Sequence, residues 1–257
     1  MAWRGAHPKR VLAVSAALFA AANLAAGAAR ADEAAIAVAA NFRLTLERLQ
    51  ATFEDASPHT LQVSSGSTGK IYAQIRHGAP YDVFLSADQD HPLRLETEGR
   101  AVAGSRFTYA SGVLALWAPG GGDPLERLRA GDFRRLALAN PSLAPYGAAA
   151  AQTLAGLAPG ETTQQKIVLG ENVGQAFAFV RSGAADLGFV AYSQVLATPV
   201  SQRGAYWRAP PSAHRPIRQD AVVLKRGAGN AAADAFVTFL KGERARAIIV
   251  DAGYGVE

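Results

Sequence analysis

The chain of 257 residues contains no cysteine. This absence excludes disulfide bridges, thiolate nucleophiles, cysteine metal sites and a lipid anchor attached through an N-terminal cysteine. Burial of apolar side chains alone must therefore hold the fold together. Long apolar runs are also missing beyond residue 31, where no segment approaches the ~20 residues that a bilayer-spanning helix needs.

An excess of one charge is missing as well, once the first 31 residues are set aside. Residues 1–31 hold four of the 26 basic residues and none of the 21 acidic ones, so 22 basic residues stand against 21 acidic residues in the remainder. A nucleic-acid-binding surface needs clustered positive charge. The composition therefore predicts that nucleic acid is not a partner.

The N-terminal segment has the parts of a secretory signal peptide. Basic residues precede a small-residue apolar stretch, VLAVSAALFAAANLAAGAA, which leads into Ala29-Arg30-Ala31, a small-x-small cleavage signal. We predict a signal peptide over residues 1–31 with cleavage before Asp32. A membrane anchor is the weaker alternative, because polar and small residues interrupt the apolar run. Residues 32–257 are enough for one large or two small domains.

Short apolar runs alternate with stretches of helical periodicity along the rest of the chain. Strands are expected over 34–40, 60–64, 81–87, 107–119, 135–140, 166–170, 185–193 and 219–225. Helices are expected over 42–56, 68–77, 146–157, 173–183, 230–240 and 243–250, and another from Asp88. This alternation predicts an α/β fold with mainly parallel sheets.

Four loops share one design, in which a strand ends, small or polar residues follow and a helix begins. They are Ala40-Asn41-Phe42, Ser64 to Lys70, Ala144 to Gly147 and Glu171 to Gly174. A helix start presents unpaired main-chain N–H groups and a partial positive charge, which suit an anion. Taken singly, each loop is an ordinary capped helix. They would surround an anion only if they converge at the carboxyl ends of the strands, and a sequence alone does not show such convergence.

Nucleotide-binding and catalytic motifs are incomplete or missing. In the run from Ser64 to Ile71, serine replaces the first glycine of a P-loop, and isoleucine follows the Gly-Lys pair where the motif needs Ser or Thr. Neither G-x-S-x-G nor H-E-x-x-H occurs. The sequence therefore predicts that the protein is not an enzyme. An exported hydrolase of small esters or phosphoesters stays as the alternative from a different class.

Five segments resemble one family over nearly the whole exported chain: VAANF (38–42), SSGSTGKIYAQIRHGAPYDVFLSAD (64–88), ANPSLAPYG (139–147), residues 171–193 and residues 239–254. They are similar to the periplasmic molybdate-binding proteins of ABC importers. The resemblance implies a type II periplasmic-binding-protein fold, with two α/β lobes, two crossover strands and a ligand cleft between the lobes.

The same resemblance implies boundaries for the two lobes. Lobe one would hold residues 32–113 plus 220–257, and lobe two would hold residues 114–219. The two crossings would fall in the predicted strand over 107–119 and near residues 216–224.

The resemblance also implies the contacts to the oxyanion. Asn41 would supply its main-chain N–H and its side-chain amide, Thr68 its hydroxyl and N–H with Ser67 beside it, and Tyr146 and Val173 their main-chain N–H groups. Molybdenum would be bound only as its oxyanion through these groups, and no cofactor is implied. Two positions depart from the family pattern: Ala40 lacks a hydroxyl found in some members, and Tyr192 stands one residue after a ligand tyrosine found in others.

The function implied is capture of molybdate or tungstate in the periplasm and delivery to a membrane permease of an ABC transporter, by a protein that is expected to be a monomer. A receptor of the same fold for sulfate or phosphate is the nearest alternative. Phosphate, which is partly protonated, would need a carboxylate acceptor, and none of the four ligand positions is acidic. A sensory or regulatory domain is disfavoured, because no DNA-binding or signalling segment is present.

Overall fold

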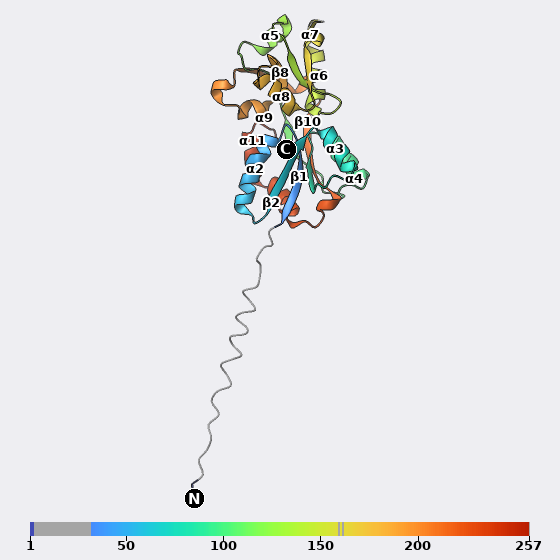
Figure 1. The fold of residues 1–257 in the computed structure, drawn as a ribbon, viewed down its shortest axis with the longest axis vertical. Coiled ribbons are helices and arrows are strands. Elements are labelled where there is room, and N and C mark those ends of the chain that lie inside the picture. The colour runs from blue at the N-terminus through green and yellow to red at the C-terminus, as the bar shows by residue number, and fades with distance from the viewer. Residues whose placement is uncertain (3–31, 159, 161, 257) are drawn as a thin grey trace. The chain divides into compact units, whose positions relative to one another are not determined.

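The computed structural model describes residues 1–2, 32–158, 160 and 162–256 (Figure 1). The predicted signal peptide and its cleavage signal lie outside the described residues. Within the described part of the chain, no helix is both long enough and apolar enough to cross a membrane. The residues from Asp32 onward contact one another as one unit, and they contain two separate β-sheets.

The first sheet has five strands in the order β2-β1-β3-β10-β4. Strands β1, β2 and β3 are parallel, whereas β10 is antiparallel to both of its neighbours, β3 and β4. The strands are β1 (Glu33–Ala39), β2 (Thr60–Gly66), β3 (Val83–Leu85), β4 (Phe107–Gly112) and β10 (Ile217–Val223).

Strand β1 is apolar along most of its length because helices cover both faces of the sheet. Ile36 and Val38 point into one core, and Ala37 points into the other. The helices of this lobe are α2 (Arg43–Ala56), α3 (Thr68–Arg76), α4 (Asp90–Thr97), α10 (Ala231–Lys241) and α11 (Glu243–Asp251), with the 3-10 turn η3 (Lys225–Gly227). Leu46 and Phe236 lie with Ile36 in the first core, as the helical periodicity predicted for residues 42–56 requires.

The second sheet has the order β7-β6-β8-β5-β9, with β6, β7 and β8 parallel and β5 antiparallel to β8 and β9. Its strands are β5 (Leu114–Ala118), β6 (Leu136–Ala139), β7 (Ile167–Gly170), β8 (Leu187–Ala191) and β9 (Ala205–Arg208). Its helices are α5 (Pro124–Ala130), α6 (Pro145–Leu157), α7 (Thr162–Gln165), α8 (Val173–Arg181) and α9 (Tyr192–Ala197), with the 3-10 turns η1 (Val200–Gln202) and η2 (Pro211–Ala213). Figure 1 shows α5 to α8 on one lobe and α2 to α4 on the other. The predicted two-lobed α/β fold is confirmed.

The chain passes between the sheets twice, from β4 to β5 and from β9 to β10. The strand predicted over 107–119 is in fact two strands, because residues up to Gly112 pair with β10 and residues from Leu114 pair with β8. Strand β10 pairs with the first sheet from Ile217 onward. The exact lobe boundaries inferred from the sequence stay a prediction.

Some element ends differ from the sequence prediction for local reasons. The strand predicted over 185–193 ends at Ala191, and α9 begins at Tyr192, because the Gln194 side chain accepts a hydrogen bond from the Ala191 N–H (3.1 Å) and starts a helix. The helix expected from Asp88 begins at Asp90. The Asp88 carboxylate precedes the helix and accepts a hydrogen bond from the His91 N–H in its first turn. Helix α5 and strand β9 were not predicted.

Candidate functional site

The first of the four predicted loops joins β1 to α2. The Ala40 N–H donates to the carbonyl of Gly66 (2.9 Å), so the ends of β1 and β2 stay together. Phe42 is fully buried and packs edge-on against Tyr109 and Tyr254, which anchors the loop from below. Asn41 sits between these two fixed points and is itself buried.

The second loop joins β2 to α3. Ser67 has an extended backbone and precedes Thr68, the first residue of the helix. Both side chains are buried. The Thr68 hydroxyl accepts a hydrogen bond from the Ala87 N–H (3.1 Å), which leaves its own proton available to donate.

The third and fourth loops belong to the second lobe. Pro145 is the first residue of α6, where its fixed φ favours a helix start, and Tyr146 follows it. A side chain at Gly147 would place its Cβ 2.4 Å from the Ala139 carbonyl oxygen, so only glycine lets α6 begin this close to β6. Val173 is the first residue of α8, and the Asn172 side chain caps that helix by accepting from the Gln175 N–H (3.0 Å).

All four loops line one small cavity between the lobes. None of the described residues that line it carries a charge. The lining residues are Ala39, Ala40, Asn41, Gly66, Ser67, Thr68, Ala87, Ala144, Pro145, Tyr146, Asn172 and Val173.

Four main-chain donors at this cavity have no partner among the described residues. Within the described part of the chain, the N–H groups of Asn41, Thr68, Tyr146 and Val173 have no hydrogen-bond acceptor. Buried N–H groups without partners are costly, and protein interiors rarely leave them so. Four such groups around one small cavity form an uncharged set of donors suited to an anion.

The Ser67 hydroxyl adds a fifth unpaired donor. Its oxygen is buried and has no hydrogen-bond partner among the described residues, although Ser67 lines the cavity. A buried hydroxyl without a partner costs free energy unless a ligand or water completes it. Ser67 therefore fits a polar ligand at this place.

The Asn41 side chain does not serve the cavity in the way the resemblance implied. Its amide nitrogen donates to the Gln219 side-chain oxygen (2.9 Å) and to the Tyr254 hydroxyl (3.2 Å). Both of its N–H bonds are therefore used behind the loop. Asn41 offers the cavity its main-chain N–H only.

Three buried tyrosines stand around this network. Burial raises the pKa of Tyr109 and of Tyr146 well above the ordinary value of a phenol, and it raises the pKa of Tyr254 to about 12. All three hydroxyls therefore stay protonated at neutral pH. The three tyrosines are thus uncharged, and of the three only Tyr146 lines the cavity.

Tyr192 does not line the cavity. Its ring lies 5.5 Å from the ring of Tyr206, and the Arg208 guanidinium sits 5.4 Å above it. Burial, followed by the hydrogen bond with Tyr206, raises the pKa of Tyr192. Ala40 lines the cavity but has no donor in its side chain, so the departure noted in the sequence leaves one donor fewer.

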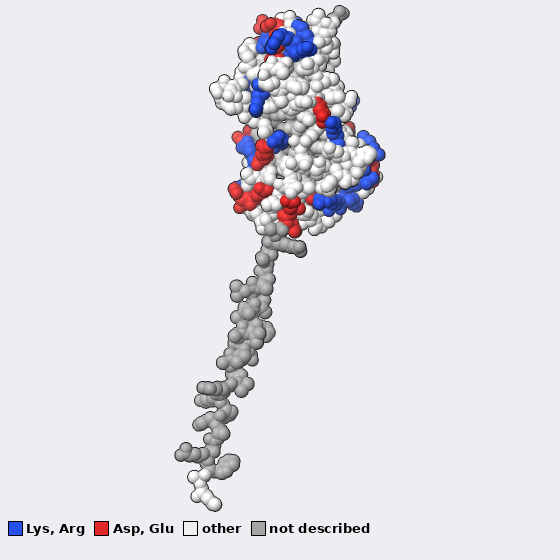
Figure 2. Space-filling model, viewed as in Figure 1, with Lys and Arg blue, Asp and Glu red and all other residues white. Residues whose placement is uncertain are grey.

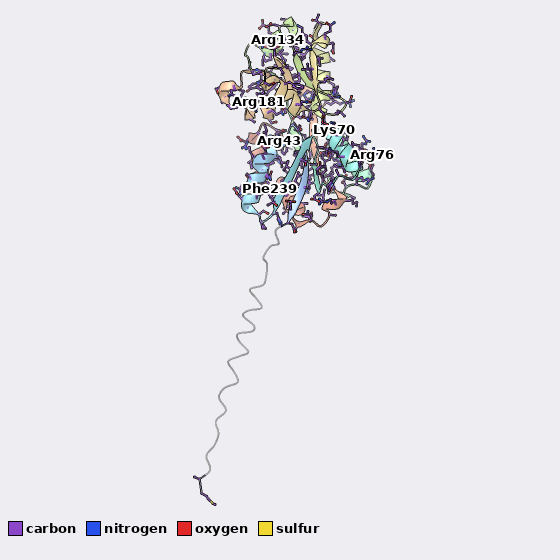
Figure 3. The ribbon with its side chains drawn as sticks, viewed as in Figure 1. Arg43, Lys70, Arg76, Arg134, Arg181 and Phe239 are labelled. Atoms are coloured by element: carbon purple, nitrogen blue, oxygen red, sulfur yellow. The ribbon has the colours of Figure 1, made fainter. Side chains whose placement is uncertain are left out.

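Gly69 and Lys70 of the first lobe both contact the second lobe beside the cavity. The Gly69 N–H donates to the Leu143 carbonyl (3.0 Å). Lys70, labelled in Figure 3, forms an ion pair with Glu171 (2.6 Å), and each partner is two residues from a cavity N–H group. Acidic and basic side chains are interspersed over the face seen in Figure 2. Glu171 thus neutralises Lys70, which is the cationic side chain nearest in sequence to the Thr68 N–H.

The sequence did not identify Ala87 or the residues behind Asn41 as parts of the site, and Asn172 was identified only as a member of the fourth loop. Gln219 carried little signal, because it stands between Arg218 and Asp220 in the sequence and its complete burial appears only in the structure. Tyr254 and Ser193 carried none, since their contacts with Asn41 span 213 and 152 residues of sequence.

The chain is similar to molybdate-binding proteins along most of its length. It is 47% identical to the molybdate-binding protein ModA of Azotobacter vinelandii over 239 residues, 92% of this chain and 95% of that one. It is 43% identical to ModA of Rhodobacter capsulatus, over 89% of this chain and 90% of that one.

Solved structures show the same relation. The periplasmic molybdate-binding protein of Azotobacter vinelandii superposes with a TM-score of 0.82, at 43% identity, over 87% of this chain and 99% of that one. The sulfate-binding protein SubI of Mycobacterium tuberculosis shares the fold, with a TM-score of 0.67 at 14% identity over 87% of this chain and 86% of that one. Residues 34–255 match the model of the bacterial extracellular solute-binding proteins, and the chain belongs to that family.

Proposed function

We propose that this protein captures molybdate or tungstate at the cavity between its lobes and delivers the anion to the membrane permease of an ABC importer. One observation carries the proposal: five predicted ligand residues, Asn41, Ser67, Thr68, Tyr146 and Val173, line one small uncharged cavity. The relatives named above are molybdate-binding proteins, which supports this ligand.

Neutral donors are well suited to a tetrahedral dianion. A hydrogen bond to a charged group contributes ~1.5–3 kcal/mol, and a micromolar complex needs ~8 kcal/mol. Four main-chain N–H groups with the hydroxyls of Ser67 and Thr68 would supply ~9 kcal/mol at the low end of that range, before the cost of desolvating the anion. The donors are fixed by helix starts, so little ordering is required on binding.

Selectivity would follow from size and from the absence of an acceptor. A rigid set of donors fits one oxygen–oxygen span best, which favours molybdate over the smaller sulfate. Hydrogen phosphate carries a proton that needs an acceptor, and the described residues lining the cavity include no carboxylate. Sulfate is therefore the closer competitor among the alternatives.

Export and docking complete the proposal. A protein released into the periplasm by the predicted signal peptide, acting as a monomer, would meet the permease from that side of the membrane. The Azotobacter relative of known structure is a periplasmic protein, which supports this location.

The hydrolase alternative has little support from the geometry. His91 pairs with Asp88 through Nδ1 (2.7 Å), as a catalytic histidine would. The nearby Ser86 hydroxyl, however, donates to Asp88 and makes no hydrogen bond to His91. A nucleophile must contact its base, so this cluster lacks the required arrangement. The relatives are solute-binding proteins, a family without enzymatic activity.

The experiment is calorimetry with molybdate on the wild type, Thr68→Ala and Asn41→Ala. We expect each variant to bind at least tenfold more weakly, Thr68→Ala through loss of a donor and Asn41→Ala through loss of the fixed loop. Thr60→Ala, at the exposed start of β2, is the matched control and should bind like the wild type. Unchanged affinity in both cavity variants would refute this assignment of the site.

A further inference from the structure

We infer that Tyr254 is a positioning residue for the anion site, acting through Asn41. This inference rests on the proposed function, since it concerns the same cavity. Tyr254 lies three residues after the end of α11, and its side chain is buried. The segment is fixed there by Gly255, whose N–H and carbonyl both pair with the main chain of Ser111 at the end of β4.

The Tyr254 hydroxyl holds Asn41 at two points. It donates to the Asn41 carbonyl oxygen (2.8 Å) and accepts from the Asn41 side-chain amide (3.2 Å). It also accepts from the Ser193 hydroxyl (2.9 Å). One donor and two acceptor positions are thus all used, which is the full capacity of a tyrosine hydroxyl.

Holding the carbonyl and the side chain of Asn41 also sets the direction of its main-chain N–H. With its carbonyl and side chain fixed, Asn41 has little freedom in its backbone dihedrals, so its N–H stays directed at the cavity. Gln219 adds a second constraint by accepting from the same amide (2.9 Å). The N–H that the anion would use is therefore placed by groups that do not line the cavity.

The same hydroxyl connects the two lobes. Ser193 belongs to α9, which follows the second sheet, whereas Asn41 follows β1 of the first. The Ser193 hydroxyl also lies 3.4 Å from the Asn41 carbonyl oxygen. Separation of the lobes would break this contact, so Tyr254 links the orientation of an anion donor to lobe closure.

A purely structural role for Tyr254 makes a different prediction. Its ring packs edge-on against Phe42 (5.1 Å), and Tyr254→Phe would keep that contact. Tyr109 is the matched control, because its buried ring also packs on Phe42 (4.8 Å). Its hydroxyl contacts the Ser86 carbonyl (2.9 Å) and Gln219 (3.1 Å) and not Asn41.

The test compares Tyr254→Phe, Tyr109→Phe and Ser193→Ala in the purified protein. Molybdate affinity is measured by calorimetry, release by stopped flow, and stability by melting of the ligand-free protein. We expect similar small losses of melting temperature for both Phe variants. Tyr254→Phe should weaken molybdate binding about tenfold, mainly through faster release, whereas Tyr109→Phe should change it less than threefold.

Ser193→Ala should also release molybdate faster than the wild type, and its release rate is the test if Tyr254→Phe does not fold. The inference would be overturned if Tyr254→Phe bound molybdate with wild-type affinity, or if Tyr109→Phe lost as much molybdate affinity as Tyr254→Phe. If Tyr254→Phe does not fold, an unchanged rate of molybdate release in Ser193→Ala would overturn it. A wild-type protein that does not bind molybdate would instead overturn the proposed function.

Discussion

At the scale of single residues, Asn41 and Ser67 offer the cavity different kinds of hydrogen-bond donor, a main-chain N–H and a side-chain hydroxyl. Asn41 is held from behind by its side chain and faces the cavity with its main chain. Ser67 has no partner for its hydroxyl within the described residues. The sequence identified both residues, but it could not tell which of their atoms face the cavity, since that depends on Gln219 and Tyr254.

Ser67→Ala should separate binding from stability. The change removes a hydroxyl that no described residue uses, so the ligand-free melting temperature should stay nearly constant. Molybdate affinity should fall about tenfold, because a hydrogen bond to a charged group is lost. Calorimetry and thermal melting measure the two effects, with the exposed Ser65→Ala as control. Equal affinity in Ser65→Ala and Ser67→Ala would exclude Ser67 from the site.

At the scale of elements, periodicity and strand–helix alternation were sufficient to predict most of both sheets. Strand β1 was predictable because it is buried on both faces and reads as a continuous apolar run. The end of β8 was not, because the side chain of Gln194 stops the strand within an apolar stretch. Strand β9 alternates half-buried and exposed residues over only four positions, which is too short a pattern to detect.

The start of β8 provides a test of pH dependence. Asp186 accepts from the N–H of Arg134 (2.7 Å) and of Arg135 (3.3 Å) and from the Arg134 guanidinium (2.9 Å). The side-chain hydrogen bond from Arg134 lowers the pKa of Asp186. A carboxylate with a lowered folded-state pKa stabilises the protein above its unfolded-state pKa of ~3.9, and this stabilisation is lost as the pH falls through the folded-state pKa.

We therefore expect Asp186→Asn to lower the melting temperature at neutral pH. The difference from the wild type should narrow as the pH falls below ~4 and through the folded-state pKa, because Asp186 of the wild type then becomes an uncharged carboxylic acid. Thermal melting across pH measures it, and Asp55→Asn on the exposed face of α2 is the control. A difference that stays constant down to about pH 2 would contradict this role.

At the scale of the whole molecule, the two lobes meet through few contacts beside the cavity. The ion pair between Lys70 and Glu171 (2.6 Å) is about half exposed on both sides. Exposed pairs contribute ~0–1 kcal/mol, and salt screens them. The pair should therefore tune how long the lobes stay closed on the anion, without deciding whether it binds.

Lys70→Met and Glu171→Gln should each speed molybdate release about two- to fivefold, and the double variant should be no faster than either alone. High salt should reduce the effect. Arg43→Met is the matched control, because Arg43 also lies two residues after a cavity residue but pairs with Glu47 inside its own helix (3.0 Å). Figure 3 labels both cations. Additive effects in the double variant would argue against a shared contact.

The convergence of the four loops is a property of the whole molecule as well. The strand–helix pattern located each loop, and the resemblance to a family implied that they meet. The network behind the site was not predictable, because Asn41, Gln219 and Tyr254 are distant in sequence and meet only where the chain crosses between the lobes.

If the uncharged cavity selects molybdate and tungstate, these two anions should stabilise the protein more than other oxyanions do. The most direct measurement is a thermal-shift series on the purified protein with equal concentrations of molybdate, tungstate, sulfate and phosphate. A ligand at a thousandfold excess over its Kd stabilises the folded state by ~4 kcal/mol. We predict that molybdate and tungstate raise the melting temperature by several degrees and that sulfate and phosphate raise it far less. No shift with any oxyanion, or a shift with sulfate as large as that with molybdate, would contradict the claim.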